Sequence, residues 1–133
     1  GVAMPDVPGL SDGDAVEFDL SGMPDMSVLS DKPRYFALKV KSDALSQAGI
    51  AAGDILVFDC DPDAQSGDLV CAQIVDYRLG TAETVIRCYD KPYLIALSDN
   101  PQHRRPIIVD DDRVQIRGVL IKQIRVKLFG SAA

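Results

Sequence analysis

The chain has 133 residues, of which 47% are hydrophobic and 26% are charged, and its formal net charge is -6. This composition suits one folded domain with a sizeable core and excludes an intrinsically disordered chain. No apolar run approaches the roughly 18 residues of a membrane span, and the acidic balance argues against a domain that holds a DNA backbone by itself.

Turn signals and short apolar runs divide the sequence into an arm and a domain. Residues 1–33 are rich in Gly, Pro, Asp, Ser and Met and are typical of a partly ordered arm or linker with one short strand at 15–18. Residues 34–130 show short runs of β-formers between Gly, Pro and Asp, with one helical turn expected at 44–48 before Gly49. The expected strands are, in chain order, 35–40, 54–58, 69–75, 84–89, 93–97, 107–109, and 114–128 as two strands or one bent strand. The sequence therefore predicts a mainly β or β-rich α+β domain.

Few residues carry the types of side chain that metal or triad chemistry needs. Cys60, Cys71 and Cys88 lack CxxC spacing and are expected as small buried hydrophobes in a reducing compartment. His103 is the one histidine, so neither a histidine-based zinc site nor a Ser-His-Asp triad is expected. No cofactor is predicted, and the absence of a signal-peptide pattern favours a cytoplasmic protein.

A series of short motifs follows a specific order between residues 35 and 128. It starts at Lys41-Ser42-Asp43-Ala44-Leu45, directly after an expected strand. It continues with Gly49-Ile50, Gly53-Asp54, Gly67-Asp68, Thr84-Val85-Ile86-Arg87, Leu97-Ser98-Asp99-Asn100, Pro106-Ile107-Ile108-Val109 and Ile116-Arg117-Gly118-Val119. Each motif is weak alone, but their order and spacing resemble the C-terminal domain of LexA-type repressors, UmuD-like proteins and phage repressors. The resemblance implies a LexA-like peptidase fold of short, twisted antiparallel sheets.

Both positions that carry this family's Ser-Lys chemistry hold apolar residues here. The family's nucleophilic serine corresponds to Ala44, and its general-base lysine corresponds to Ile86. Alanine supplies no oxygen for attack on a carbonyl, and isoleucine supplies no amine to accept the hydroxyl proton. The resemblance therefore implies a vestigial site and no peptidase activity. The vestigial cleft is expected to include Ser42, Asp43, Leu45 and Arg87.

The side chains around this site do not suggest a replacement for the lost dyad. Ser42 and Ser46 stand two residues away from the nucleophile position, and we expect them to be turn or cap serines. Arg87 and Tyr89 share the strand of Ile86, where they either line the vestigial cleft or occupy exposed strand positions, and we favour exposed positions. The family's self-cleavage bond, Ala-Gly or Cys-Gly, is also absent between Gly1 and Ala44.

The resemblance implies a non-catalytic dimerisation and regulatory domain of a transcriptional repressor. A homodimer would present two helix-turn-helix domains, encoded upstream of Gly1, to operator DNA. With self-cleavage lost, an antirepressor protein or a small ligand would release the repressor. A Ser-Lys self-cleaving domain captured as an inactivated variant and a UmuD-like interaction module are the alternatives. We favour natural degeneracy, because isoleucine is an unusual engineered replacement for lysine.

The last apolar run is the expected dimer surface. In the family, the C-terminal strands meet across a two-fold axis, and the corresponding stretch here is 119–128. Leu120, Ile124, Val126 and Leu128 occupy alternate positions, so a strand would place them on one face. This face either pairs with its symmetry mate or packs on the domain's own core.

Overall fold

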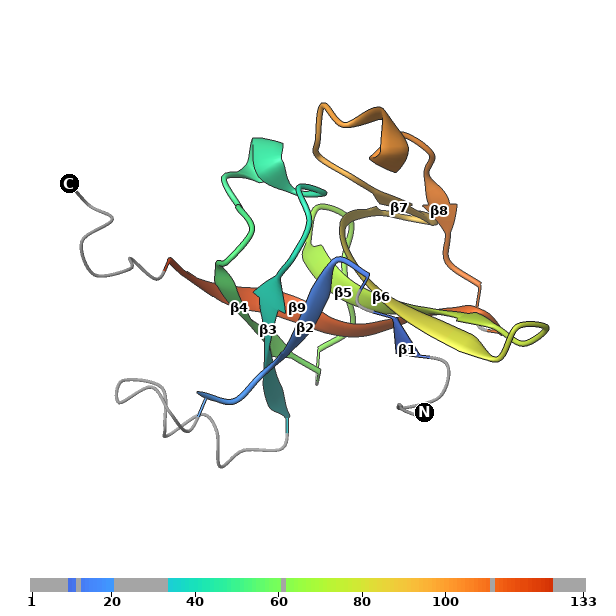
Figure 1. Ribbon diagram of the computed structural model, residues 1–133, viewed down its shortest axis with the longest axis horizontal. Helices are drawn as coiled ribbons and strands as arrows, with labels where there is room; N and C mark the ends of the chain where they lie inside the picture. Colours follow the sequence, from blue (N-terminus) through green and yellow to red (C-terminus); the bar gives the residue numbers. More distant parts are fainter. Residues whose placement is uncertain (1–9, 12, 21–33, 61, 111, 126–133) are drawn as a thin grey trace.

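The computed structural model describes residues 10–11, 13–20, 34–60, 62–110 and 112–125 (Figure 1). Its strands are β1 (Leu10–Ser11), β2 (Ala15–Phe18), β3 (Tyr35–Val40), β4 (Ile55–Asp59), β5 (Leu69–Asp76), β6 (Thr81–Asp90), β7 (Tyr93–Ile95), β8 (Ile107–Ile108) and β9 (Val114–Ile124). Two 3-10 turns, η3 (Ser46–Ala48) and η4 (Pro101–His103), lie in loops that Figure 1 shows on the same side of the sheet. Among these residues, no helix is long and apolar enough to cross a membrane.

The nine strands found among the described residues belong to one sheet. The order β2-β3-β4-β9-β5-β6-β7-β8 is antiparallel throughout, and β1 pairs in parallel with β6. Because β2 also contacts β6, the sheet curls around its own core. The predicted β-rich class is confirmed, with one curled sheet where several short sheets were expected.

The strand β9 joins the two halves of the sheet. Its first half pairs with β5, and its second half, from Val119 onward, pairs with β4. Two register shifts leave Arg117 and Ile121 of β9 without an opposite residue, so the strand bends at both places. The region 114–124 is therefore one bent strand, which is the second of the two expected arrangements.

Gly118 lies at the crossing of these two halves. A Cβ atom there would stand 2.8 Å from the ring of Phe36 and 3.0 Å from the Cβ of Phe58. The two phenylalanine rings stack with centroids 5.3 Å apart. Glycine is thus required where the β9 backbone passes against this aromatic pair.

Local sequence signals place most of the other elements where they were expected. Gly49 ends η3 in the left-handed region with φ of 82°, and Gly80 turns the β5–β6 hairpin with φ of 66°. In that hairpin, Asp76 Oδ1 accepts hydrogen bonds from the backbone N–H groups of Arg78 and Leu79. The arm contributes the expected strand β2 and also the short strand β1, which was not expected.

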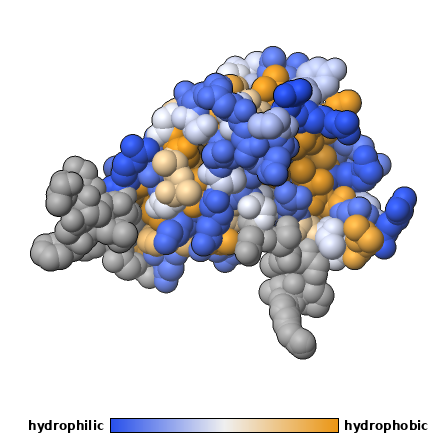
Figure 2. Space-filling view, turned by 45° about the horizontal axis from the view of Figure 1, so that its top comes forward, coloured by the Kyte–Doolittle hydropathy of each residue, from blue (hydrophilic) through white to orange (hydrophobic). Residues whose placement is uncertain are grey.

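Alternation along the strands builds three apolar clusters beneath a mainly hydrophilic surface, one face of which appears in Figure 2. Cys71 is buried and Cys88 is half-buried, as expected for small apolar side chains. The expectation was wrong for Cys60, which is exposed because it follows the last residue of β4.

Candidate functional site

Two loops meet next to the middle of β6. One follows β3, and the other leads into η4. Ala44 connects the two loops, because its carbonyl accepts a hydrogen bond of 2.8 Å from the Leu97 N–H. The Gln47 N–H in turn donates to the Leu97 carbonyl at 2.8 Å. These backbone bonds fix the loop that carries Ala44 against the loop that carries Asn100.

Ala44 and Ile86 lie in the same apolar cluster, and both are 0% exposed. Leu45 and Val40 are buried in this cluster as well. The two positions that the resemblance matches to the Ser-Lys dyad therefore lie in a closed apolar core, and neither side chain carries a polar atom.

Cys71 is the one nucleophilic side chain buried in that cluster among the described residues. Burial raises the pKa of its thiol to about 12, with a smaller contribution from the charge of Asp14. The sulfur is therefore protonated at neutral pH and does not replace the serine oxygen that is absent at Ala44.

Next to Ile86, Arg87 forms a buried ion pair with Asp14. The Arg87 side chain is 8% exposed and that of Asp14 is 6% exposed. One Asp14 oxygen, Oδ2, accepts hydrogen bonds from both Arg87 Nη1 and the Ile86 N–H. The expectation of exposed strand positions was thus wrong for Arg87, and also for Tyr89, which is buried in another cluster. The residue that explains the burial of Arg87 is its partner Asp14. Asp14 belongs to the arm, and the periodicity of the sequence around Arg87 does not reveal this contact.

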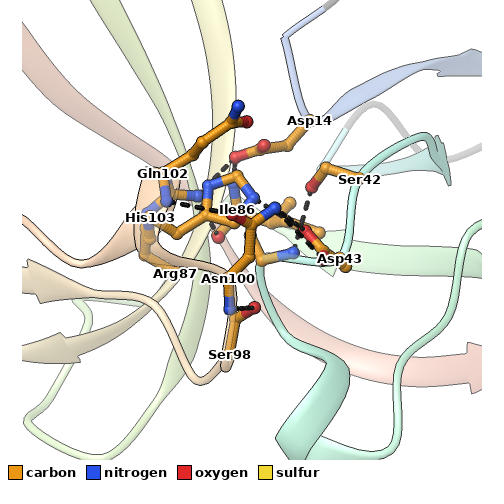
Figure 3. Close-up of polar contacts among 10 residues, drawn as sticks. Asp14, Ser42, Asp43, Ile86, Arg87, Ser98, Asn100, Gln102 and His103 are labelled. Atoms are coloured by element: carbon orange, nitrogen blue, oxygen red, sulfur yellow. Dashed lines mark hydrogen bonds and ion pairs between the residues drawn. The ribbon is translucent and has the colours of Figure 1, made fainter.

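A second polar cluster holds the loop of η4 over the loop that follows β3 (Figure 3). His103 Nε2 lies 2.8 Å from Asp43 Oδ1, and Asn100 Nδ2 donates to both Asp43 oxygens at 3.2 and 3.3 Å. These contacts lower the pKa of the Asp43 carboxyl below its ordinary value of 3.8, and the hydrogen bond from Asn100 has a larger effect than the one with His103. Sequence reasoning gave His103 and Asn100 no part in the site.

Between these two clusters lies a pocket of about 670 Å³. It is lined by Gly13, Asp14, Lys41, Ser42, Asp43, Ser46, Ile50, Ala51, Ala52, Glu83, Asn100, Gln102 and His103. Of the expected cleft residues, Ser42 and Asp43 line this pocket, whereas Leu45 and Arg87 are buried beside it. The Ser42 hydroxyl accepts a hydrogen bond of 3.2 Å from the Ala44 N–H, which confirms its expected role in the turn. No group of three or more potential metal ligands occurs among the described residues.

The expected dimer residues fall in two parts of the chain. Leu120 and Ile124 are half-buried and pack against the domain's own apolar clusters. Val126 and Leu128 lie outside the described residues. Within the described part of the chain, residues 120–124 pair with β4 along one edge, and no strand pairs with their opposite edge.

Ile121 lies on this half-paired stretch and is 49% exposed. It is one of the two β9 residues that a register shift leaves without an opposite residue. Sequence alternation gave it no role, because it falls out of phase with Leu120 and Ile124.

Comparisons with known proteins agree with this architecture. The family model described as peptidase S24-like matches residues 8–121. The chain is 30% identical over 112 residues to a LexA repressor of Pelagibacter ubique, which covers 84% of this chain and 48% of that protein. It is 34% identical over 91 residues to a LexA repressor of Gluconacetobacter diazotrophicus, and this match covers 68% of the chain and 34% of that protein. The chain thus spans about half or less of the length of these relatives.

Proposed function

The chain belongs to the peptidase S24-like family, and from this membership we propose that it is a non-catalytic dimerisation and regulatory domain of a LexA-type or phage-type repressor. One observation carries the non-catalytic part of the proposal. Ala44 and Ile86, at the matched dyad positions, lie fully buried in one apolar cluster and offer neither a hydroxyl nor an amine. A peptidase of this type requires both groups.

The regulatory part of the proposal rests on the relatives and on charge. The relatives are repressors of which this chain covers about half or less, so operator binding is proposed for a helix-turn-helix domain upstream of it. The net charge of -6 supports this division, because phosphate contacts are made by clustered cations. We propose that the repressor acts in the cytoplasm and is released from DNA by a partner such as an antirepressor protein.

Prolonged incubation at alkaline pH should leave the domain intact. Ala44→Ser should also stay intact, because Ile86 does not accept the proton of the new hydroxyl. Intact-mass spectrometry of both proteins over several days checks this result. A discrete fragment from cleavage at one bond near the N-terminus would contradict the proposal, whereas scattered fragments would indicate a contaminating protease.

We propose that two copies associate through the second half of β9. Its unpaired edge at residues 120–124 is the kind of edge that pairs across a two-fold axis, and an isologous dimer needs such a self-complementary contact. Ile121 supports this placement because it is a large apolar side chain on the same stretch, 49% exposed. Leu120 and Ile124 are poorer sites for a test, since both also pack on the core.

Ile121→Glu should weaken the dimer by about tenfold or more, because it places two carboxylates close to the symmetry axis. The matched control is Ile108→Glu, which introduces the same charge at an isoleucine that is 58% exposed on β8, at the far end of the sheet. Sedimentation equilibrium gives the dissociation constants, and thermal melting verifies that both variants fold. Equal dissociation constants for the two variants would place the interface elsewhere.

A further inference from the structure

The curl of the sheet leaves a pocket where β2 and β6 move apart. The two strands lie close together at the start of β2 (Figure 1), where the Asp14 N–H donates to the Thr84 carbonyl at 2.8 Å. Farther along, β2 pairs with β3 on one edge, and no described strand pairs with its other edge. A pocket of about 520 Å³ lies there, and it shares no described lining residue with the pocket next to Asp43. This volume suits a small organic molecule.

The floor of this pocket is apolar. Leu38 and Cys71 line it and are buried in one cluster, and Phe36, which also lines it, is half-buried against the same cluster. The Cys71 thiol is protonated at neutral pH, so it counts as a small apolar group. The floor therefore offers an apolar surface on which a hydrophobic part of a ligand can lie.

Arg117 brings a positive charge to the pocket. It is the β9 residue that the first register shift leaves without an opposite residue, and a bulge of this kind redirects a side chain. Arg117 lines the pocket, and its charge acts on the thiol of Cys71 in the floor. Burial raises the pKa of that thiol to about 12, and the nearby guanidinium opposes the shift. The Arg117 guanidinium thus lies near enough to the floor to contact a ligand bound on it.

Glu17 on β2 brings a negative charge to the same pocket. Glu17 is exposed, and Asp19 adds a second carboxylate on this side. Within the described part of the chain, neither Glu17 nor Arg117 forms an ion pair. Arg117 makes one long hydrogen bond, of 3.4 Å from Nη1 to Gln115 Oε1. The two opposite charges therefore line one pocket from different strands without pairing with each other, and both are available to a ligand.

We propose that this pocket binds a free α-amino acid with an apolar side chain. The ligand carboxylate pairs with Arg117, its ammonium group pairs with Glu17, and its side chain lies on the apolar floor. A simple anion or a simple cation uses only one of the two charges. The site does not depend on the proposed function, but in a repressor it would receive a small-molecule signal away from the positions of the lost dyad.

Isothermal titration calorimetry tests the ligand class with L-phenylalanine and three compounds that each lack one of its features. 3-Phenylpropanoate lacks the ammonium group, 2-phenylethylamine lacks the carboxylate, and glycine lacks the apolar side chain. Each should bind about tenfold or more weakly than phenylalanine does, because each loses one of the three contacts. Equal affinity for phenylalanine and either compound with a single charge would overturn the inference, as would an absence of phenylalanine binding at millimolar concentrations.

Two variants assign the charges. Arg117→Gln should bind phenylalanine about tenfold more weakly and leave the affinity for 2-phenylethylamine unchanged, whereas Glu17→Gln should do the same and leave the affinity for 3-phenylpropanoate unchanged. The matched control is Arg105→Gln, which removes an exposed cation outside this pocket and should change none of these affinities. Thermal melting verifies that all three variants fold. An equal effect of Arg105→Gln and Arg117→Gln would overturn the site, since net charge alone would then explain the binding.

The cysteines locate the bound ligand within a single protein. Cys60 is exposed and lines the pocket, whereas Cys88 is half-buried and does not line it. Saturating phenylalanine should slow the alkylation of Cys60 by iodoacetamide several-fold and leave the rate at Cys88 unchanged, and mass spectrometry of the digested protein measures both rates. Unchanged alkylation of Cys60 would place the ligand elsewhere and overturn the inference. None of these measurements depends on whether the domain cleaves itself, so the proposed function and this site can fail separately.

Discussion

Replacing Ile86 with lysine should lower the free energy of unfolding by about 4 kcal/mol at pH 7, a larger loss than we expect from any other single substitution proposed for this domain. The residue is 0% exposed in an apolar cluster, and the Asp14 carboxylate next to its backbone is already paired with Arg87. The folded domain would hold the lysine amine neutral, so burial would lower its pKa far below the ordinary value. Urea denaturation of the variant and of wild type at pH 7 measures the difference.

The pH dependence separates charge burial from poor packing. The unfolded variant binds one proton more than the folded variant at neutral pH, so the stability of the variant should rise as the pH rises toward the ordinary pKa of lysine. Ile86→Met, which keeps volume and polarity, is the matched control and should cost less than about 1.5 kcal/mol with no such pH dependence. Equal losses for lysine and methionine would contradict a closed apolar environment at this position.

Asp54→Ala should also be strongly destabilising, with a loss of about 3 kcal/mol at pH 7. The buried Asp54 carboxylate accepts hydrogen bonds from Arg125 Nε at 3.1 Å and Nη2 at 2.9 Å, and from Gln123 Nε2 and the Ala51 N–H, both at 2.9 Å. These bonds connect the loop after η3 to the end of β9. Chemical denaturation gives the loss of stability.

The contribution of Asp54 should also depend on pH in a defined direction. Its hydrogen bonds with Arg125 above all lower the pKa of the carboxyl below the ordinary value of 3.8. A lowered pKa stabilises the fold at every pH above 3.8, and this stabilisation is lost as the pH falls through the folded-state pKa. The gap between wild type and Asp54→Ala should therefore stay constant from pH 7 to about pH 5 and narrow only below pH 4.

Asp43→Ala is the matched control for this experiment. The Asp43 carboxyl also has a lowered pKa, but its side chain is exposed and its partners are Asn100 and His103. Solvent screens such contacts, so the loss of stability should be much smaller than for Asp54→Ala. Similar losses for the two variants would mean that burial of the Asp54 carboxylate adds nothing to the strength of its hydrogen bonds.

Local sequence signals were sufficient for most of the strands. The β5–β6 hairpin followed from two runs of β-formers on either side of Gly80, although β6 begins at Thr81 and not at the expected residue 84, and β3 followed from the alternation of Tyr35–Val40. The end of η3 followed from Gly49, which has the left-handed conformation that glycine favours. These features depend on residues that are neighbours in the chain, so the local sequence contains the information that determines them.

Contacts between distant segments were not predictable in this way. The alternation of Leu120 and Ile124 identified an apolar face, but it did not show that β9 lies between β4 and β5 in the middle of the sheet. Arg87 was expected to be exposed, and its burial depends on Asp14 in the arm. In both cases the contacting residues are far apart in the sequence, so the periodicity of neighbouring residues does not predict the contact.

The central position of β9 has a consequence for how the domain is made. A ribosome releases β4 and β5 early, but each gains its second neighbour in the sheet only when residues 114–124 arrive. Until then, both strands present unpaired edges, and the loop closures needed to pair them with β9 are long. The domain therefore completes its fold at the end of its own synthesis, after any domain encoded upstream of it has had time to fold.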